Sequence, residues 1–160
     1  MAQAAFLFDV VDRIRPIHTA VETSGHVSDQ VFSQALKKID LIIMDVKLMD
    51  CALHRQYTGV GNEQIQNNLT TLLESGHRCI IRVPVIPGVN DNDENMLATA
   101  ERIKGFPGIE RVELLTYHKT AGAKYPLVRR EYEYVLPYSP KDTHEFCRFF
   151  ENKGIPVFVP

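Results

Sequence analysis

Residues 41–47 read Leu41-Ile-Ile-Met-Asp-Val-Lys47, a nearly continuous apolar run that ends in a carboxylate and an ammonium group. A run of this kind is typical of a strand that is buried on both faces in a parallel sheet. The residues before it predict a helix, because Ser28 can cap its first turn and apolar side chains recur at helical spacing from Val31 to Ile39. A helix that leads into a buried strand is a basic unit of an α/β fold.

The same helix-then-strand unit repeats on both sides of residues 41–47. Pro84 places the last part of its strand at or beyond the pairing zone of the sheet. Capping residues and glycines mark the ends of the other elements. The predicted helices carry the stripe Phe6, Leu7, Val10, Val11 and Ile14, or run from Asn62 to Gly76, from Asp91 or Asn92 to Gly105, and from Ser139-Pro140 to Gly154; the predicted strands are residues 18–23, 79–86, 112–118 and 157–159.

These alternating elements predict a single α/β domain over residues 1–160. Each strand is rich in Val, Ile and Leu, which favours parallel pairing with right-handed crossovers. Because the sequence has no glycine-rich phosphate loop, we favour a (β/α) barrel over a nucleotide-binding doubly wound sheet. About five strand signals are too few for the eight strands of a closed barrel, so we expect a partial (β/α) barrel with parallel strands.

Composition and charge argue against several function classes. The 160 residues contain 18 Lys plus Arg and 20 Asp plus Glu, and the formal net charge of −2 argues against a nucleic-acid or polybasic membrane surface. Hydrophobic residues make up 44%, enough to bury a core. No apolar run approaches the roughly 18 residues that a membrane span needs, and the N-terminus lacks the layout of a signal peptide. We expect a soluble cytoplasmic protein.

The three cysteines, Cys51, Cys79 and Cys147, lie too far apart in the sequence for a C-x-x-C or C-x-x-x-C-x-x-C ligand set. We therefore expect these residues to hold neither zinc nor an iron–sulfur cluster. Cys79 and Cys147 lie inside apolar runs, where a buried structural thiol is the expected role. No disulfide is expected.

Polar side chains gather where the first four predicted strands end. Functional groups of parallel β/α sheets collect at the C-terminal ends of the strands, so these side chains are candidates for one site. Asp45 and Lys47, two positions apart on a strand, point to the same face. Such a set of acids and bases suits a small zwitterion or a carboxylate-bearing cofactor. The candidates are Glu22 and Thr23, Asp45 and Lys47, Arg82, and Tyr117 with His118.

The candidate residues also have other interpretations. Asp45 and Lys47 can form a solvated ion pair at a strand end, and Arg82 can be a structural ion-pair partner. His118 can be a hydrogen-bonded core histidine. Two further function classes stay open, namely an aldolase-like barrel in which Lys47 forms a Schiff base with a carbonyl substrate, and a non-catalytic docking or binding module.

Five sequence blocks occur in the order found in one enzyme family. Together they resemble the C-terminal part of the glycyl-radical-enzyme activating enzymes, which include the pyruvate formate-lyase activating enzyme, from about Gln3 to the end of the chain. The blocks are His18-Thr-Ala-Val-Glu-Thr-Ser-Gly25, Asp40-Leu-Ile-Ile-Met-Asp-Val-Lys47, Tyr57-Thr-Gly-Val-Gly-Asn62, Ile81-Arg-Val-Pro-Val-Ile-Pro-Gly-Val-Asn90, and Leu114-Leu-Thr-Tyr-His118 with Lys124-Tyr125.

The resemblance implies a radical S-adenosylmethionine (SAM) enzyme with a partial (β/α)6 barrel and a [4Fe–4S] cluster held by C-x-x-x-C-x-x-C. In that family a 5′-deoxyadenosyl radical from SAM takes a hydrogen atom from a glycine of a partner glycyl radical enzyme, and flavodoxin or ferredoxin donates the electron. Carried over by position, the cofactor-binding residues are Asp45 and Lys47 in the D-x-K element that serves the methionine moiety and a nearby cation, Glu22 and Thr23 beside it, and Arg82 and His118 at the glycine-radical end of the barrel.

Two features of that family are absent from these 160 residues, namely the cluster-binding cysteines and a Gly-Gly-Glu segment. We therefore expect the C-terminal section of a full activating enzyme, which alone is inactive and binds neither cofactor tightly. Glu22 replaces an aspartate of the family, and Ala121-Gly122 shifts a loop glycine by one position. Without an upstream strand, residues 18–23 form an exposed edge, which predicts self-association or partial cover by the N-terminal helix.

Overall fold

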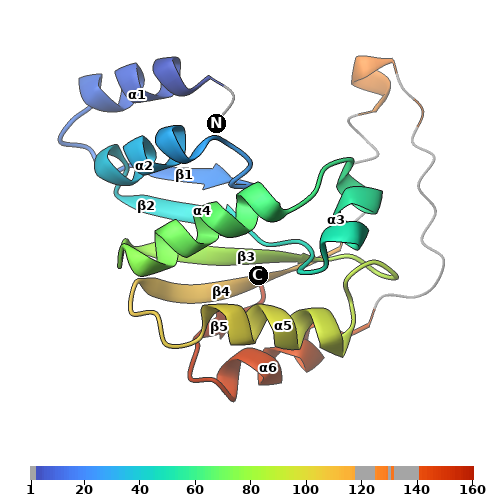
Figure 1. Cartoon of the computed structure of the whole chain (residues 1–160). Coiled ribbons are helices and arrows are strands. Elements are labelled where there is room, and N and C mark those ends of the chain that lie inside the picture. Colours follow the sequence, from blue (N-terminus) through green and yellow to red (C-terminus); the bar gives the residue numbers. More distant parts are fainter. Residues whose placement is uncertain (1–2, 118–124, 130, 132–140) are drawn as a thin grey trace.

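The computed structural model describes residues 3–117, 125–129, 131 and 141–160 (Figure 1). The predicted helix start at Ser139-Pro140 lies outside these ranges. The helices are α1 (Ala4–Arg13), α2 (Asp29–Lys38), α3 (Cys51–Thr58), α4 (Glu63–Glu74), α5 (Asp93–Ile103) and α6 (Cys147–Glu151), with the 3-10 turns η2 (Pro126–Val128) and η3 (Thr143–Phe146). The strands are β1 (Ala20–Thr23), β2 (Leu41–Asp45), β3 (Cys79–Val85), β4 (Ile109–Thr116) and β5 (Val157–Phe158).

The strands of the described residues form one sheet in the order β1-β2-β3-β4-β5, and every neighbouring pair is parallel. Helices connect the successive strands (Figure 1), which confirms the predicted α/β class. β1 stands at one edge of the sheet, in agreement with the edge strand predicted for residues 18–23. Self-association through that edge stays a prediction.

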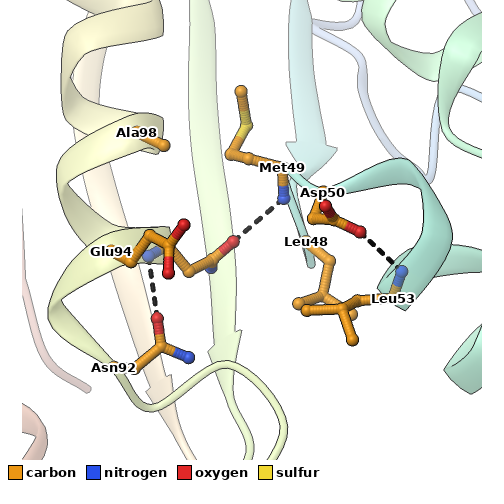
Figure 2. A pocket seen from close by; sticks show the side chains of 8 residues that line it. Leu48, Met49, Asp50, Leu53, Asn92, Glu94 and Ala98 are labelled. Carbon is orange, nitrogen blue, oxygen red and sulfur yellow. Dashed lines mark hydrogen bonds between the residues drawn. The ribbon is translucent and has the colours of Figure 1, made fainter.

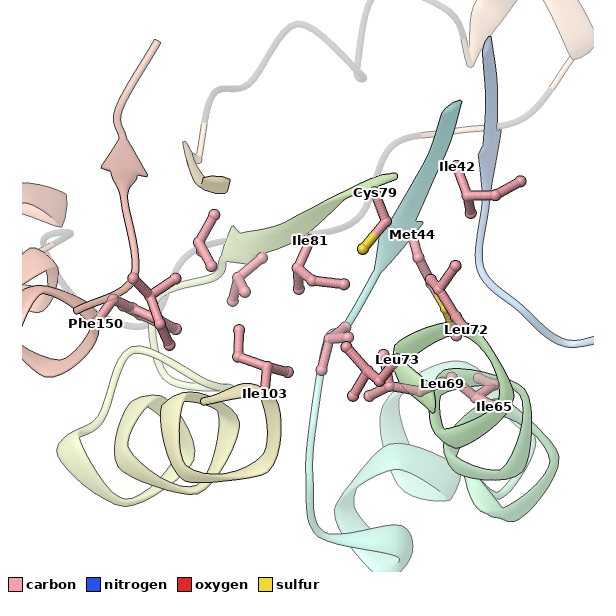
Figure 3. Packing of buried hydrophobic residues seen from close by; sticks show 14 of the residues in the cluster. Ile42, Met44, Ile65, Leu69, Leu72, Leu73, Cys79, Ile81, Ile103 and Phe150 are labelled. Carbon is pink, nitrogen blue, oxygen red and sulfur yellow. The ribbon is translucent and has the colours of Figure 1, made fainter. Parts of the chain in front are cut away.

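The hydrophobic core lies between the helices and one face of the sheet. Ile42 and Met44 of β2 and Ile81 of β3 are fully buried, and they pack in one cluster with helix residues such as Leu69 and Leu72 (Figure 3). Strand side chains alternate between faces, so the residues between these positions belong to the opposite face. Helices packed against a single face of a parallel sheet give the arrangement of an opened (β/α) barrel.

The opposite face carries the charged strand residues, and we call Glu22, Asp45, Arg82 and Glu113 with their neighbour Arg111 the polar sheet face. The strand register brings these residues together, because Asp45 of β2 stands beside Arg82 of β3, and Arg82 stands beside Glu113 of β4. Parallel strands in register present paired residues to the same side. The strand register therefore assembles this charged cluster from distant parts of the sequence.

Two predicted helix caps are confirmed. The hydroxyl of Ser28 accepts a hydrogen bond from the Val31 N–H at the start of α2, and the side chain of Asn92 accepts one from the Asn95 N–H at the start of α5.

The buried face of α1 differs from the predicted stripe, because Phe8 is buried whereas Phe6 of that stripe is 70% exposed. Among the described helices, none is both long and apolar enough to cross a bilayer.

Helix α3 is not in the sequence prediction, because its eight residues carry no apolar stripe and His54 is its one buried residue. It begins after Asp50, whose carboxylate accepts a hydrogen bond of 2.7 Å from the Leu53 N–H. It ends at Gly59, which takes a left-handed φ of 83°. The helix is therefore specified by its two ends, an N-cap acid and a C-cap glycine, rather than by hydrophobic periodicity.

Asn62 and Pro84 differ from expectation. Asn62 stands at the N-cap of α4 without a capping bond, and its side chain instead donates to the carbonyls of Leu48 and Met49. Pro84 lies past the last residue pair between β2 and β3 but still pairs with Leu115 of β4. The prediction that the strand from Pro84 onward lies at or beyond the pairing zone is therefore correct on the β2 side of the strand and wrong on the β4 side.

Candidate functional site

Four of the predicted site residues share one side of the sheet. Glu22 and Arg82 form an ion pair of 2.8 Å, and Lys47 forms another of 2.8 Å with Asp45. Thr23 lies on the opposite, helix-covered face, where its buried hydroxyl accepts a hydrogen bond from the Gly25 N–H. The Thr23 side chain is therefore not part of this cluster. His118 lies outside the described residues.

Arg82 is held between carboxylates from two other strands. Its guanidinium contacts Glu22 of β1 at 2.8 Å and Glu113 of β4 at 2.9 Å. The second oxygen of Glu113 accepts from Arg111 at 2.6 Å. The side chains of Arg82 and Glu113 are only 18% and 8% exposed. This chain of four charges therefore links three strands and fixes the orientation of the Arg82 guanidinium.

Burial and pairing act in opposite directions on these groups. Burial lowers the pKa of Arg82, but hydrogen bonds to Glu22 and Glu113 outweigh it and leave the pKa raised. Burial likewise raises the pKa of Glu113, but hydrogen bonds from Arg111 and Arg82 outweigh it and leave that pKa lowered. Both groups are therefore charged at neutral pH.

Glu113 and Arg111 are the site residues that sequence reasoning missed. They lie in and just before the predicted strand 112–118, and nothing in the local sequence relates them to Arg82, which is 31 positions away from Glu113. The one available signal was alternation, because Arg111 and Glu113 alternate with the apolar Val112 and Leu114 along the strand. A charged pair on one face of a buried strand indicates a polar partner on the neighbouring strand.

The ion pairs of the polar sheet face and Lys47 balance in charge. Glu22, Asp45 and Glu113 supply three carboxylates, and Lys47, Arg82 and Arg111 supply three cations. A zwitterion brings one charge of each sign, so it can exchange partners with such a set without leaving a net charge behind. Among these ion pairs, Lys47–Asp45 is the one in which both side chains are about 30% exposed, whereas each other pair contains a more buried partner, so it is open to this exchange.

The surroundings of Lys47 do not favour the Schiff-base alternative. A lysine that attacks a carbonyl is activated by an apolar pocket or by a neighbouring cation. Lys47 instead contacts the carboxylate of Asp45 at 2.8 Å and keeps 31% of its side chain exposed. These contacts favour ionic recognition of a ligand over covalent attack by the amine.

The three cysteines do not come together. Cys79 is buried, and burial raises the pKa of its thiol to about 12. Cys147 is half-buried, and burial likewise raises the pKa of its thiol. Cys51 is half-buried at the start of α3. Among the described residues, no three His, Cys, Asp or Glu side chains are grouped to hold a metal, so these cysteines do not fit an iron–sulfur cluster.

A pocket of about 280 Å³ lies between the start of α3 and the start of α5 (Figure 2). None of the predicted site residues that the structure describes lines it, although its edge begins at Leu48, one residue after Lys47. Glu22, Asp45, Lys47 and Arg82 therefore lie outside this pocket. The lining residues are Leu48, Met49, Asp50, Leu53, Asn92, Glu94, Asn95 and Ala98.

Comparison with known proteins identifies relatives, although no family sequence model matches the chain. The (2S)-3-sulfopropanediol sulfolyase activating enzyme of Bilophila wadsworthia is 42% identical over 121 residues, which cover 74% of this chain and 40% of that enzyme. The 4-hydroxyphenylacetate decarboxylase activating enzyme of Clostridioides difficile is 34% identical over 165 aligned residues, which cover 99% of this chain and 52% of that enzyme. The chain belongs to the family of glycyl-radical-enzyme activating enzymes.

The chain spans about half the length of these activating enzymes or less, and it corresponds to their C-terminal portion. Solved structures agree in fold. A crystallised domain of the pyruvate-formate lyase-activating enzyme from Bacteroides vulgatus matches with a TM-score of 0.81 at 23% identity, covering 99% of this chain and 92% of that one. Streptococcus suis SuiB bound to S-adenosylmethionine matches with a TM-score of 0.60 at 12% identity, over 98% of this chain and 33% of SuiB. The partial (β/α) barrel is thus confirmed.

Proposed function

We propose that this chain is the cofactor-binding C-terminal section of an activating enzyme that generates a glycyl radical on a partner enzyme. The observation that carries the proposal is the charge-balanced polar sheet face beside Lys47, in a chain of the activating-enzyme family. An S-adenosylmethionine ligand presents an α-amino acid group, which is the zwitterion that such a face suits. When bound to a reduced [4Fe–4S] cluster, this cofactor supplies the radical that takes a hydrogen atom from the glycine.

The residues of this chain fit the amino-acid part of the cofactor and do not fit the cluster. We propose that Lys47 binds the carboxylate of the methionine moiety, while Asp45 and Glu22 accept hydrogen bonds from its amine or the ribose hydroxyls, or pair with a nearby cation. In this exchange Lys47 leaves Asp45 for a second carboxylate, and Asp45 gains a cation in return, so every charge stays paired. The chain alone then binds S-adenosylmethionine weakly and is inactive.

Arg82 has a different part in the proposal. Glu22 and Glu113 hold its guanidinium in place on the polar sheet face, so it is oriented before any ligand arrives. We propose that Arg82, with His118, lines the end of the barrel that receives the cofactor and the partner's glycine. The partner is a glycyl radical enzyme, the electron donor is a flavodoxin or ferredoxin, and the reaction takes place in the cytoplasm.

Substitution of Lys47 in the full-length protein tests this function. Lys47→Ala is expected to weaken the binding of S-adenosylmethionine, measured by calorimetry, and to reduce the glycyl radical yield, measured by electron paramagnetic resonance. Lys38→Ala is the matched control, because Lys38 is 32% exposed and pairs with Asp12 on the helix side of the sheet. Unchanged cofactor affinity and radical yield in Lys47→Ala, with a native fold, would refute the proposal.

A further inference from the structure

Buried asparagines hold the chain segment that carries Lys47. The side-chain amide of Asn90 donates to the carbonyls of Lys47 and Pro84, at 2.7 Å each. Its oxygen accepts from the Ile86 N–H at 2.7 Å. Asn90 is fully buried, and all three of these bonds go to backbone groups. One side chain therefore ties the end of β2 to the end of β3.

Two more asparagines continue this contact along residues 47–49. Asn95, at the start of α5, donates to the Lys47 carbonyl at 3.3 Å and accepts from the Met49 N–H at 2.9 Å, a bond dashed in Figure 2. Asn62, at the start of α4, donates to the carbonyls of Leu48 and Met49, at 2.9 Å each. Both asparagines are more than nine-tenths buried. We call Asn62, Asn90 and Asn95 the asparagine clamp.

The clamp acts where the sheet no longer fixes the backbone. The last ladder bond of this segment is that from the Val46 N–H to the Arg82 carbonyl at 2.9 Å, one residue before Lys47. Beyond it the Lys47 carbonyl would have no strand partner, yet it accepts from both Asn90 and Asn95. A fixed carbonyl fixes the peptide plane and, with it, the direction in which the Lys47 side chain leaves the backbone.

We propose that Asn90 and Asn95 are positioning residues that keep the Lys47 ammonium beside Asp45 on the polar sheet face. This inference rests on the proposed function of Lys47 as the group that binds the cofactor carboxylate. An amide is suited to the role because it donates and accepts at once, whereas a carboxylate of the same shape only accepts. Aspartate has nearly the same volume as asparagine. At position 95 it removes the donor of the bond to Lys47, and at position 90 it removes the donor of the bonds to both Lys47 and Pro84.

The test compares Asn90→Asp and Asn95→Asp with Asn68→Asp in the full-length protein. Asn68 is a matched control, because it is also fully buried and donates to two backbone carbonyls, those of Gly25 and Val27, at 2.8 Å each. The first measurement, made without cofactor, is the rate of reductive methylation at Lys47, read by mass spectrometry. The second is the KM for S-adenosylmethionine compared with kcat.

We expect Asn90→Asp and Asn95→Asp to speed the methylation of Lys47 and to raise the KM about tenfold, the scale typical of a lost orienting contact, with a smaller change in kcat. Asn68→Asp should lower the thermal stability without either effect. If Asn90→Asp does not fold, Asn95→Asp, whose bond to Lys47 is longer, provides the same comparison. Methylation rates and KM values equal to those of Asn68→Asp would overturn the positioning role.

The two proposals fail differently. If Lys47→Ala weakens cofactor binding while both clamp variants behave like the control, the positioning role is wrong and the proposed function stands. If Lys47→Ala has no effect on cofactor binding, the proposed function is wrong, and the methylation rate of Lys47 still shows whether the clamp orients the side chain.

Discussion

At the scale of single residues, Glu113 is the carboxylate on which the polar sheet face depends. It is 8% exposed and accepts from two arginines, one on its own strand and one on β3. A buried carboxylate is tolerated because both of its oxygens are paired with cations. Arg82 and Arg111 in turn keep a fixed place because they share this one acceptor.

Neutralising Glu113 should destabilise the protein. Glu113→Gln keeps the shape but leaves the 18% exposed Arg82 with Glu22 alone and takes the carboxylate partner from Arg111, so we expect a loss of about 2 kcal/mol in the free energy of unfolding. Glu110→Gln is the control on the same strand, since Glu110 pairs with a mostly exposed Arg78, and it should cost less than about 1 kcal/mol. Urea denaturation at pH 7 measures both, and equal losses would contradict the prediction.

The same carboxylate predicts a pH dependence. Its pKa in the folded protein lies below the ordinary value of 4.5, because the arginine hydrogen bonds outweigh burial. The ion pairs of Glu113 therefore stabilise the fold fully above pH of about 4.5 and are lost as the pH falls through the lowered pKa. The stability difference between the wild type and Glu113→Gln should shrink from pH 5 to about pH 3. A stability difference between the two proteins that stays constant from pH 5 to about pH 3 would contradict a stabilising role for the ionised Glu113 carboxylate.

At the scale of elements, local sequence predicted the parts whose causes are local. The caps at Ser28 and Asn92 bond to their own first turns, and the strand Leu41–Asp45 is apolar by itself. Helix α3 was not predicted, because it is specified by the capping residues at its two ends and not by a stripe of apolar side chains. The capping bond predicted for Asn62 is absent, because its side chain binds carbonyls that are 13 and 14 residues away in the sequence. Tertiary partners of this kind are not visible in a single sequence.

Two glycines that end or follow elements provide a matched comparison. Gly25 after β1 and Gly59 after α3 both have left-handed φ values, 73° and 83°. A Cβ at Gly59 meets nothing within 4 Å, so Gly59→Ala should cost only the backbone strain of about 1 kcal/mol. A Cβ at Gly25 would lie 2.3 Å from Cε of the buried Met44, so Gly25→Ala should cost about 1 to 3 kcal/mol more. Equal losses in chemical denaturation would show that Met44 moves aside freely.

At the scale of the whole molecule, the sheet of the described residues has one face covered by helices, and β1 and β5 are its two edge strands. The alternation of helices and strands was enough to predict this class of fold. The pairing of charges on the polar sheet face was not predictable, because it depends on the register between strands that lie more than 30 residues apart.

The edge position of β1 predicts self-association of the 160-residue chain. Among the described residues, β2 is the one strand that pairs with β1 (Ala20–Thr23), so the outer side of β1 can add a strand from a second copy. Light scattering should show oligomers that grow with protein concentration, and hydrogen exchange of the amides in residues 20–23 should slow in parallel. A monomer at every concentration, with fast exchange in these amides, would contradict the prediction.

The equal number of acids and bases around Lys47 also affects how a ligand arrives. Alternating charges cancel over a few ångströms, so the cluster projects almost no field into the solvent and cannot attract a ligand from a distance. Capture of a zwitterion then depends on random encounter, followed by rearrangement of ion pairs at contact. The association rate of S-adenosylmethionine should accordingly change little with ionic strength. Its dissociation rate, by contrast, should change when Lys47, Asp45 or Glu22 is replaced by a neutral residue.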